Sequence, residues 1–191
     1  MYSVVKTCGV CIAIMAVSQQ AHAGLVINIT EDSGNVEAEF SGTMDLLALS
    51  AGVGVVNAYN GHLASIGAFG NGGSVDTYGG DVAAWTPFGT GAFANWDSVF
   101  GDSIALFTDV PVILGLNEGY VSGALTSGGA TSFGTDFATL GFDIGSYTTT
   151  LTNSATGVSD TVTINVGVPA PSAIALLGFA GVFGAKRRRS A

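Results

Sequence analysis

The sequence has almost no basic side chains between its two ends. Of its five Lys and Arg residues, Lys6 lies near the start and the others form the block 186–189, whereas all 14 Asp and Glu lie between Glu31 and Asp160. Nucleic acids and anionic lipids are bound through cationic side chains. We therefore expect no nucleic-acid partner. A divalent cation such as Ca²⁺ is the one cofactor that this acidic region permits, and we expect none of another kind.

Charged residues of both signs are scarce. They make up 10% of the 191 residues, against about a quarter in a typical soluble domain. Hydrophobic residues make up 48%, and there are 29 glycines. This composition predicts a β-rich extracellular module rather than a helical enzyme. It also excludes a disordered acidic chain, because disorder requires low hydrophobicity.

Residues 1–23 have the parts of a secretory signal peptide. A lysine precedes the ten apolar residues 8–17, and Ala21 and Ala23 are small residues in front of a cleavage site at Gly24. Ten apolar residues are too few for a transmembrane helix, which needs about 20. We therefore expect export through a Sec-type machinery and removal of this segment by signal peptidase.

Cysteine occurs only twice, at Cys8 and Cys11, inside the segment that we expect to be removed. The C-x-x-C spacing is found in redox and metal sites. Cleavage would take both residues away, so the mature protein would have no disulfide, no thiolate nucleophile and no thiolate metal ligand. We interpret the spacing as chance.

Residues 168–191 carry three features in a fixed order: a short proline motif, 14 uncharged and mostly apolar residues at 172–185, and a basic block. As a helix, the apolar stretch would be about 21 Å long, which is short for a hydrocarbon core of about 30 Å. We expect a transmembrane helix that anchors weakly and is held by the basic block on the cytoplasmic side. The motif is Val168, Pro169, Ala170 and Pro171, and the block is Lys186, Arg187, Arg188 and Arg189.

This order resembles the PEP-CTERM sorting signal of bacterial exosortase substrates, with Ala170 where the namesake Glu usually stands. The resemblance implies that an exosortase-like membrane enzyme recognises the motif and cuts near it. The protein would then pass from transient inner-membrane anchoring to the cell surface or the exopolysaccharide matrix. Prolines suit such a motif because they keep it extended and free of helix. The alternative is a plain C-terminal membrane anchor without processing.

Residues 24–167 are predicted to form one domain, an antiparallel β-sandwich that is jelly-roll-like. Apolar and polar residues alternate in several stretches, as in strands with one buried and one solvated face. Repeated strands separated by glycine-rich turns favour two packed sheets. The predicted strands are 25–30, 35–41, 103–107, 112–114, 120–125, 146–152 and 160–166, with hairpin turns at 31–35 and 153–157.

Two further stretches resemble a module that proteins with this kind of tail often carry. One is Gly-Tyr-Val-Ser-Gly at 119–123, and the other is the L-G-x-x-x-G-x-Y pattern at 140–147. The opening hairpin with its acidic-Gly turn at 31–35 belongs to the same resemblance. The module implies a β fold and brings no activity with it.

The middle of the domain, residues 57–102, is rich in Gly, Asn and aromatic residues. These rings could stack on sugars, but we favour a core that they fill beneath long loops. His62 is the one histidine outside the signal peptide, and without a G-x-S-x-G elbow we expect it to be solvated in a loop. Residues 72–78 resemble a Ca²⁺-binding repeat only faintly, since the pattern occurs once. The aromatic residues are Tyr59, Phe69, Tyr78, Trp85, Phe88, Phe93, Trp96 and Phe100.

These features predict an exported structural or adhesive protein that associates with exopolysaccharide, and not an enzyme. A secreted hydrolase acting on polysaccharide is the alternative. Glycoside hydrolysis needs a selected pair of carboxylates, and nothing in the sequence selects two of the 14 acids. The expected mature domain also lacks Lys, Arg and Cys, which supply many general bases and oxyanion donors.

Overall fold

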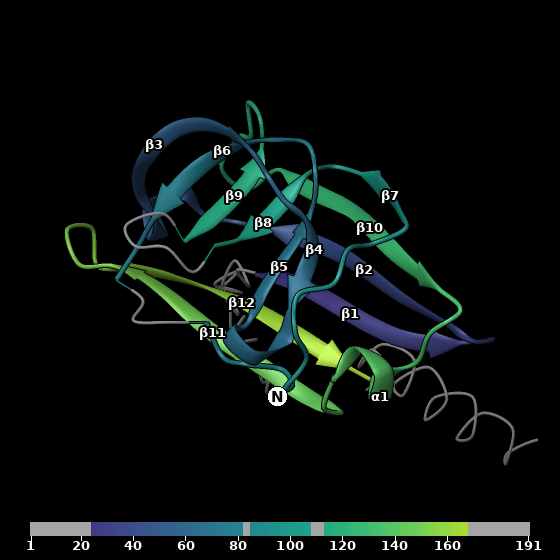
Figure 1. Ribbon diagram of the computed structural model, residues 1–191. Coiled ribbons are helices and arrows are strands. Elements are labelled where there is room, and N and C mark those ends of the chain that lie inside the picture. Colours follow the sequence, from purple (N-terminus) through teal and green to yellow (C-terminus); the bar gives the residue numbers. More distant parts are fainter. Residues whose placement is uncertain (1–23, 82–84, 108–112, 168–191) are drawn as a thin grey trace, which may run out of the picture.

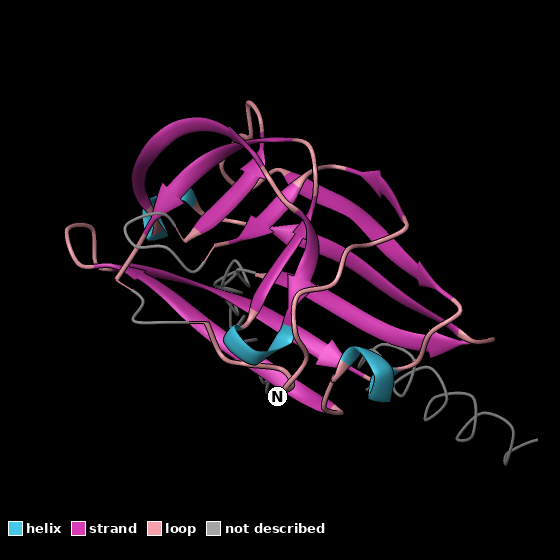
Figure 2. Ribbon diagram, in the orientation of Figure 1, coloured by secondary structure: helices cyan, strands magenta, loops and turns pink. Residues whose placement is uncertain are grey.

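The computed structural model describes residues 24–81, 85–107 and 113–167. This part of the chain is mostly β-structure, in two six-stranded sheets that form no closed barrel (Figures 1 and 2). No helix within these residues is long and apolar enough to cross a membrane. The predicted signal helix and transmembrane helix lie outside the described residues.

The first sheet, sheet A, contains the two ends of the described chain. Its strand order is β11-β12-β1-β2-β10-β7. The strands are β1 (Leu25–Asp32), β2 (Asn35–Thr43), β7 (Ser98–Gly101), β10 (Leu125–Phe133), β11 (Gly145–Asn153) and β12 (Val158–Val166).

The second sheet, sheet B, is built from the middle of the chain in the order β3-β6-β9-β8-β5-β4. Three one-turn helices accompany the strands: η1 (Leu46–Ala48), η2 (Ala64–Ile66) and α1 (Phe137–Leu140). The strands are β3 (Ser50–Asn57), β4 (Asn60–Leu63), β5 (Ala68–Asn71), β6 (Ser74–Gly79), β8 (Ile104–Leu106) and β9 (Leu114–Asn117).

The two hairpins predicted from the sequence are confirmed. β1 and β2 pair antiparallel across Ser33 and Gly34, which both have positive φ, 53° and 78°. Two such residues match the right-handed twist of the flanking strands. β11 and β12 pair from Gly145–Val166 to Asn153–Val158 without a register shift.

Sheet A is not wholly antiparallel, which corrects the prediction. The first strand, β1, runs parallel to the last strand, β12, with Leu25 beside Val162 and Ile29 beside Val166. A hairpin cannot join parallel neighbours, so the rest of the domain lies between these two strands in the sequence. Both strands are inside the sheet, and the first and last described residues therefore lie at adjacent strands (Figure 1).

One hydrophobic core lies between the two sheets. Val36, Ala38 and Phe40 of β2 point inward, as their alternation with acidic residues predicts. Side chains of β1 and β12 meet those of β8 and β9 in the same cluster. The largest fully buried side chains include Leu25, Ile27, Ile29, Met44, Phe69, Phe88, Ile104, Leu106, Leu114, Leu116 and Leu151.

Several strand predictions need correction. The strand at 103–107 is confirmed as β8, but the stretch 120–125 forms turns rather than a strand. Gly119 and Gly123 adopt φ of 77° there, and Ala124 N–H donates to Val121 C=O in a turn. The expected strand at 112–114 begins instead at Leu114, and its first residue lies outside the described part.

The middle of the chain is also more regular than predicted. It contributes β4, β5 and β6, which are half of sheet B, and β7 of sheet A, whereas the described residues between β6 and β7 form no strand. Close backbone approach explains the many glycines. A Cβ on Gly61 would lie 2.4 Å from Ala94 O, and one on Gly70 would lie 2.5 Å from Tyr59 O. Glycine is required at both positions because no other residue fits there.

Candidate binding surface

A row of residues on the outer face of sheet A crosses the sheet from one edge to the other, and two of its members, Asn165 and Gly129, are themselves buried. The strand registers place one residue of each strand in this row, and side chains at paired positions lie on the same face. We call it the polar row, although its last member is aromatic. Its members, from β11 to β7, are Ser146, Asn165, Asn28, Glu39, Gly129 and Phe100.

Hydrogen bonds fix one half of the polar row. Ser146 Oγ donates to Asn165 Oδ1 at 2.7 Å, and Asn165 Nδ2 donates to Asn28 Oδ1 at 3.0 Å. The chain of bonds orients both amides, and within the described part of the chain Asn28 Nδ2 makes no hydrogen bond, so it can donate to a ligand. Polar groups held in this way lose little side-chain entropy when they bind a ligand.

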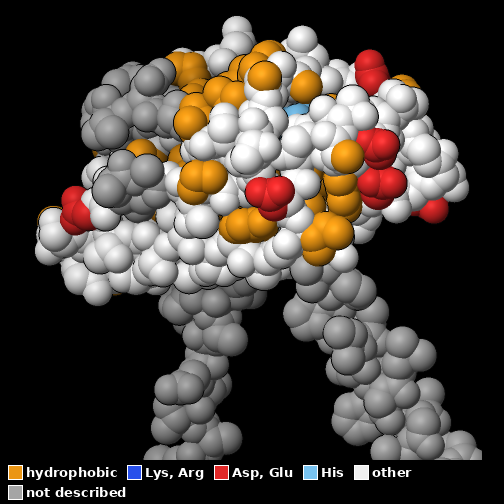
Figure 3. Space-filling model, turned by 60° about the horizontal axis from the view of Figure 1, so that its bottom comes forward, with side chains coloured by type: hydrophobic (Ala, Val, Ile, Leu, Met, Phe, Trp, Pro, Cys, Tyr) orange, Lys and Arg blue, Asp and Glu red, His pale blue; other side chains and the backbone are white. Residues whose placement is uncertain are grey.

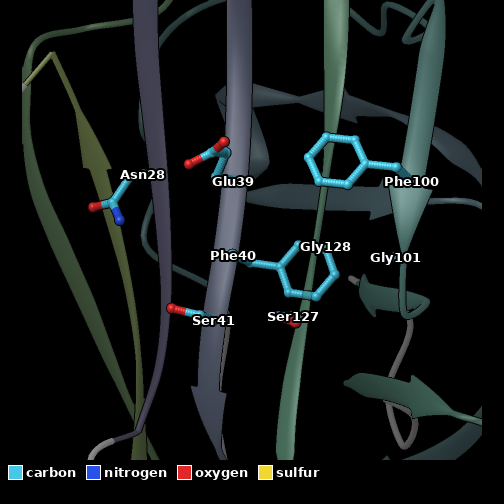
Figure 4. Close-up of a pocket in the computed structure, with 8 residues that line it drawn as sticks. All are labelled: Asn28, Glu39, Phe40, Ser41, Phe100, Gly101, Ser127 and Gly128. Carbon is cyan, nitrogen blue, oxygen red and sulfur yellow. The ribbon is translucent and has the colours of Figure 1, made fainter.

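The other half of the polar row borders a shallow hollow of about 360 Å³. Figure 4 shows the Phe100 ring lying across β10 and Glu39 on the neighbouring β2, with Asn28 and Ser41 nearby. Glycines at 128 and 129 leave the floor without side chains, and a Cβ on Gly129 would lie 2.6 Å from the Phe100 ring. The hollow is lined by Asn28, Glu39, Phe40, Ser41, Phe100, Gly101, Ser127 and Gly128.

The chemistry of the hollow suits binding better than catalysis. Phe100 is 54% exposed, so one ring face is free for stacking against an apolar ligand face. Glu39 is the one carboxylate among the described residues that line the hollow, whereas glycoside hydrolysis uses two. Hydroxyl and amide groups from Asn28, Ser41 and Ser127 complete a set that can hydrogen-bond a neutral polar ligand.

The described surface is acidic and carries no obvious metal site. Figure 3 shows one face with scattered acidic side chains, and none of the described residues is Lys or Arg. Within the described part of the chain, no three His, Cys, Asp or Glu side chains are grouped so that they could hold a metal ion. In the stretch 72–78, Asp76 Oδ2 instead accepts a hydrogen bond of 2.8 Å from Gly119 N–H.

Most of the residues predicted from the sequence for processing lie outside the described residues. These are Ala21 and Ala23, the motif Val168–Pro171 and the block Lys186–Arg189. Gly24 is described, and it is buried with φ of 57°. A Cβ at Gly24 would lie 2.5 Å from Thr161 Oγ1, so the fold itself requires glycine here.

His62 was expected in a solvated loop, and that expectation is wrong. It lies on β4, is 0% exposed, and neither ring nitrogen has a hydrogen-bond partner among the described residues. Its imidazole packs against Trp96 and Phe142, with ring centroids 4.6 and 4.5 Å away. Burial lowers the pKa of His62 to about 4, because the charged form would lose its hydration. His62 is therefore a neutral core residue.

The preference for aromatic core residues in the middle of the domain is largely confirmed. Trp85 and Trp96 are buried, and their indole N–H groups donate to backbone carbonyls. Phe69 and Phe88 are buried, and Tyr59 and Tyr78 pack partly buried against the core. The two exceptions are Phe93 and Phe100, which are 52% and 54% exposed.

The motif at 119–123 has a structural role. Met44 N–H donates to Tyr120 Oη at 2.7 Å, and Tyr120 Oη donates to Ala124 C=O at the same distance. Ser122 Oγ accepts from Leu46 N–H at 2.9 Å. The motif thus fixes the segment that leads from β2 into η1.

The motif at 140–147 has a structural role as well. Gly141 ends α1 in the left-handed conformation, and its carbonyl accepts from Thr90 and Gly91 N–H. A Cβ on Gly141 would lie 2.5 Å from Gly91, so only glycine fits at this crossing. Tyr147 Oη donates to Asp143 C=O at 2.9 Å and fixes the approach to β11.

A scan against protein-family models and searches of curated proteins and of solved structures found no match to this chain.

Sequence reasoning missed the polar row because its members come from six separate strands. The alternation in 35–41 places Glu39 on the outer face, and this was visible in the sequence. The partners of Glu39 were not visible, because the pairing of β2 with β10 links residues about 90 positions apart. A local pattern carries no signal for such a contact.

Burial of neutral His62 predicts a specific pH dependence. A histidine in the unfolded chain has a pKa of about 6.5, above the folded value of about 4. As the pH falls between these two values, protons bind the unfolded state and the folded state loses stability. Between pH 7 and pH 5 we expect His62 to cost about 2 kcal/mol of unfolding free energy. Replacing His62→Leu should remove this share, as measured by urea unfolding at both pH values.

The carboxylates provide the internal control, because they titrate in both proteins. The difference between wild type and His62→Leu in how the unfolding free energy changes with pH therefore gives the contribution of His62 alone. Equal slopes for wild type and His62→Leu would show that the imidazole is not held neutral by burial.

Proposed function

We propose that this chain is an exported bacterial protein of the cell surface or exopolysaccharide matrix, processed at a PEP-CTERM-type tail. The observation that carries the proposal is the ordered tail: the motif 168–171, the apolar stretch 172–185 and the basic block 186–189. A signal-peptide pattern in residues 1–23 completes the route. The domain between is an antiparallel, jelly-roll-like sandwich apart from its one parallel strand pair.

The limits of the described strands are compatible with both cuts. β1 begins at Leu25, directly after the expected signal cleavage, and β12 ends at Val166, just before the proline motif. Cleavage at both places would leave every described strand whole. The buried core contains no cysteine, so the processed domain would keep its fold without a disulfide.

The polar row supports a structural or adhesive role toward a neutral glycan. A sugar ring offers an apolar face that can stack on Phe100, and hydroxyl groups that Asn28, Glu39 and Ser41 can hydrogen-bond. The row crosses six strands at about 4.8 Å each, which suits an extended chain of several sugar units. An acidic surface without cations disfavours an anionic ligand.

Two alternatives stay open. A polysaccharide hydrolase would need a second carboxylate opposite Glu39, beyond those lining the hollow. A plain membrane anchor would keep residues 172–185 on the mature protein.

Trypsin tests both processing events with one reagent. Trypsin cuts after Lys and Arg, and residues 24–185 contain neither. We expect the protein isolated from its host to keep its mass after trypsin treatment even when fully denatured, because no cleavable bond is left. The measurement is the intact mass of the protein before and after digestion.

The control is the unprocessed full chain, which trypsin should shorten at Lys6 and at the block 186–189. If the host protein loses mass in the same way, or if its mass includes residues 172–185, the processing proposal is wrong and the plain anchor is favoured.

A matched pair of variants tests glycan binding. Phe100→Ala should weaken co-sedimentation with the host exopolysaccharide about fivefold, since a stacked ring contributes on the order of 1 kcal/mol. Phe133→Ala is the control, because Phe133 on the neighbouring β10 is exposed to a similar degree, 59%, but does not line the hollow. Equal binding of both variants would refute the site. New reducing ends in the glycan would instead favour the hydrolase.

A further inference from the structure

The four edges of the two sheets are protected to different degrees. An exposed edge strand offers unpaired backbone groups to another strand, and folded proteins usually block such edges. In sheet B, the edge strand β4 is covered, because His62 and Ala94 exchange both backbone hydrogen bonds at 2.9 and 3.0 Å. The other edge, β3, has a register shift between Ala51 and Val55, and Gly54 within it has φ of 115°.

Sheet A has one protected and one open edge. β7 has only four residues and ends at Gly101, with φ of 78°. β11 has nine residues and pairs in register along its whole length. It contains no charged residue, no proline and no bulge. Among the described residues, the neighbouring segment contacts β11 at Thr152, whose C=O accepts from Asp81 N–H, and at the Thr149 side chain, which accepts from Thr86 N–H. No charge, proline or bulge protects the backbone of Ser146, Thr148 and Thr150.

Three residues of β11 direct both of their backbone polar groups away from the sheet. In an antiparallel pair, alternate residues face the partner strand. Asn153 C=O accepts from Gly157 N–H within the hairpin, while Thr152 C=O accepts from Asp81 N–H on the opposite side. The even-numbered residues therefore face outward. Among the described residues, no backbone group donates to or accepts from those of Ser146, Thr148 and Thr150 on this edge.

We propose that β11 is a self-association edge, where a second copy of this chain pairs antiparallel with the same strand. A two-fold axis at Thr148 places Thr148 opposite its own copy and Ser146 opposite Thr150. This register uses the outward backbone groups and avoids Thr152, whose carbonyl already has a partner. Sheet A then continues into the second copy as one twelve-stranded sheet.

The charge distribution favours a second copy at this strand. The described residues carry acids and no Lys or Arg, so most contacts between two copies would bring like charges together. β11 is a long strand without any acid. The side chains of β11 on the outer face of the sheet are hydroxyls, and two of them already hydrogen-bond hydroxyls of β12. Thr148 Oγ1 pairs with Thr163 Oγ1, and Thr152 Oγ1 pairs with Ser159 Oγ, both at 2.9 Å. Facing Thr148 side chains would extend this pattern.

Cysteine cross-linking tests the edge in the full chain. With Cys8→Ser and Cys11→Ser as background, Thr148→Cys introduces the one thiol. In the proposed pairing, the two residues would have Cα atoms about 5.5 Å apart, within reach of a disulfide. We expect mild oxidation of intact host cells to give a covalent dimer, seen on a non-reducing gel, with twice the mass of the processed chain.

Thr163→Cys is the matched control, because Thr163 neighbours Thr148 on the same face but lies on an inner strand. Two copies of Thr163 would be about 14 Å apart, too far for a disulfide. Adding Thr150→Pro to Thr148→Cys should lower the dimer yield several-fold, because proline lacks the backbone N–H that would donate to the second copy. This N–H faces away from β12, so its loss removes no hydrogen bond within sheet A. Circular dichroism checks that this variant folds.

Three results would overturn the proposal. The first is that Thr148→Cys gives no cross-linked product, and the second is that the two cysteine variants give equal dimer yields. The third is a product with the mass of this chain joined to a different protein, which would show that the edge binds another partner. None of these results bears on processing or glycan binding, which have their own tests.

Discussion

The parallel pairing of the first and last strands is the constraint on which the rest of the domain depends. β1 pairs with β12 through Leu25–Val162 to Ile29–Val166, and Gly167 N–H donates to Ile29 C=O at 2.8 Å. Every other described element lies between these two strands in the sequence. Contacts over such a separation form late, because the loop-closure entropy is lost before they stabilise the fold. Under the proposed export route, the chain would stay unfolded until its last strand has crossed the membrane.

The same pairing builds the surfaces that we connect with function. It joins the β1–β2 and β11–β12 hairpins into one sheet, and so brings Asn28 beside Asn165 in the polar row. It also places β11 at the edge of sheet A, where the outward backbone groups of Ser146, Thr148 and Thr150 are unpaired among the described residues. The proposed glycan surface and the proposed self-association edge therefore meet at Ser146. In a matrix protein, such an arrangement would place the polar rows of two copies on the same face of one continuous sheet, offset along the paired strands because Ser146 lies opposite Thr150.

The hairpins at the two ends were predictable because alternation and turn residues are local signals. β10 was not predicted, because its Gly128 and Gly129 suggest a turn. Those glycines are in a strand because rings occupy both faces: a Cβ on Gly128 would lie 2.7 Å from Phe40, and one on Gly129 would lie 2.6 Å from Phe100. The burial of His62 was equally invisible, since it depends on Trp96 and Phe142 from distant segments. Residues outside the described part keep their sequence-based interpretation.

Native-state hydrogen exchange of the full chain, resolved by residue, tests the central role of the β1–β12 pair most directly. The amides of Ile27 and Asn165 face each other's strands across this pair, by alternation from the Gly167–Ile29 bond. If the pair holds the domain together, both amides will exchange only through global unfolding, with the full unfolding free energy. The account would be contradicted if these two amides exchanged at a much lower free energy, in step with the other amides of β11 and β12. That result would show that the β11–β12 hairpin opens by itself.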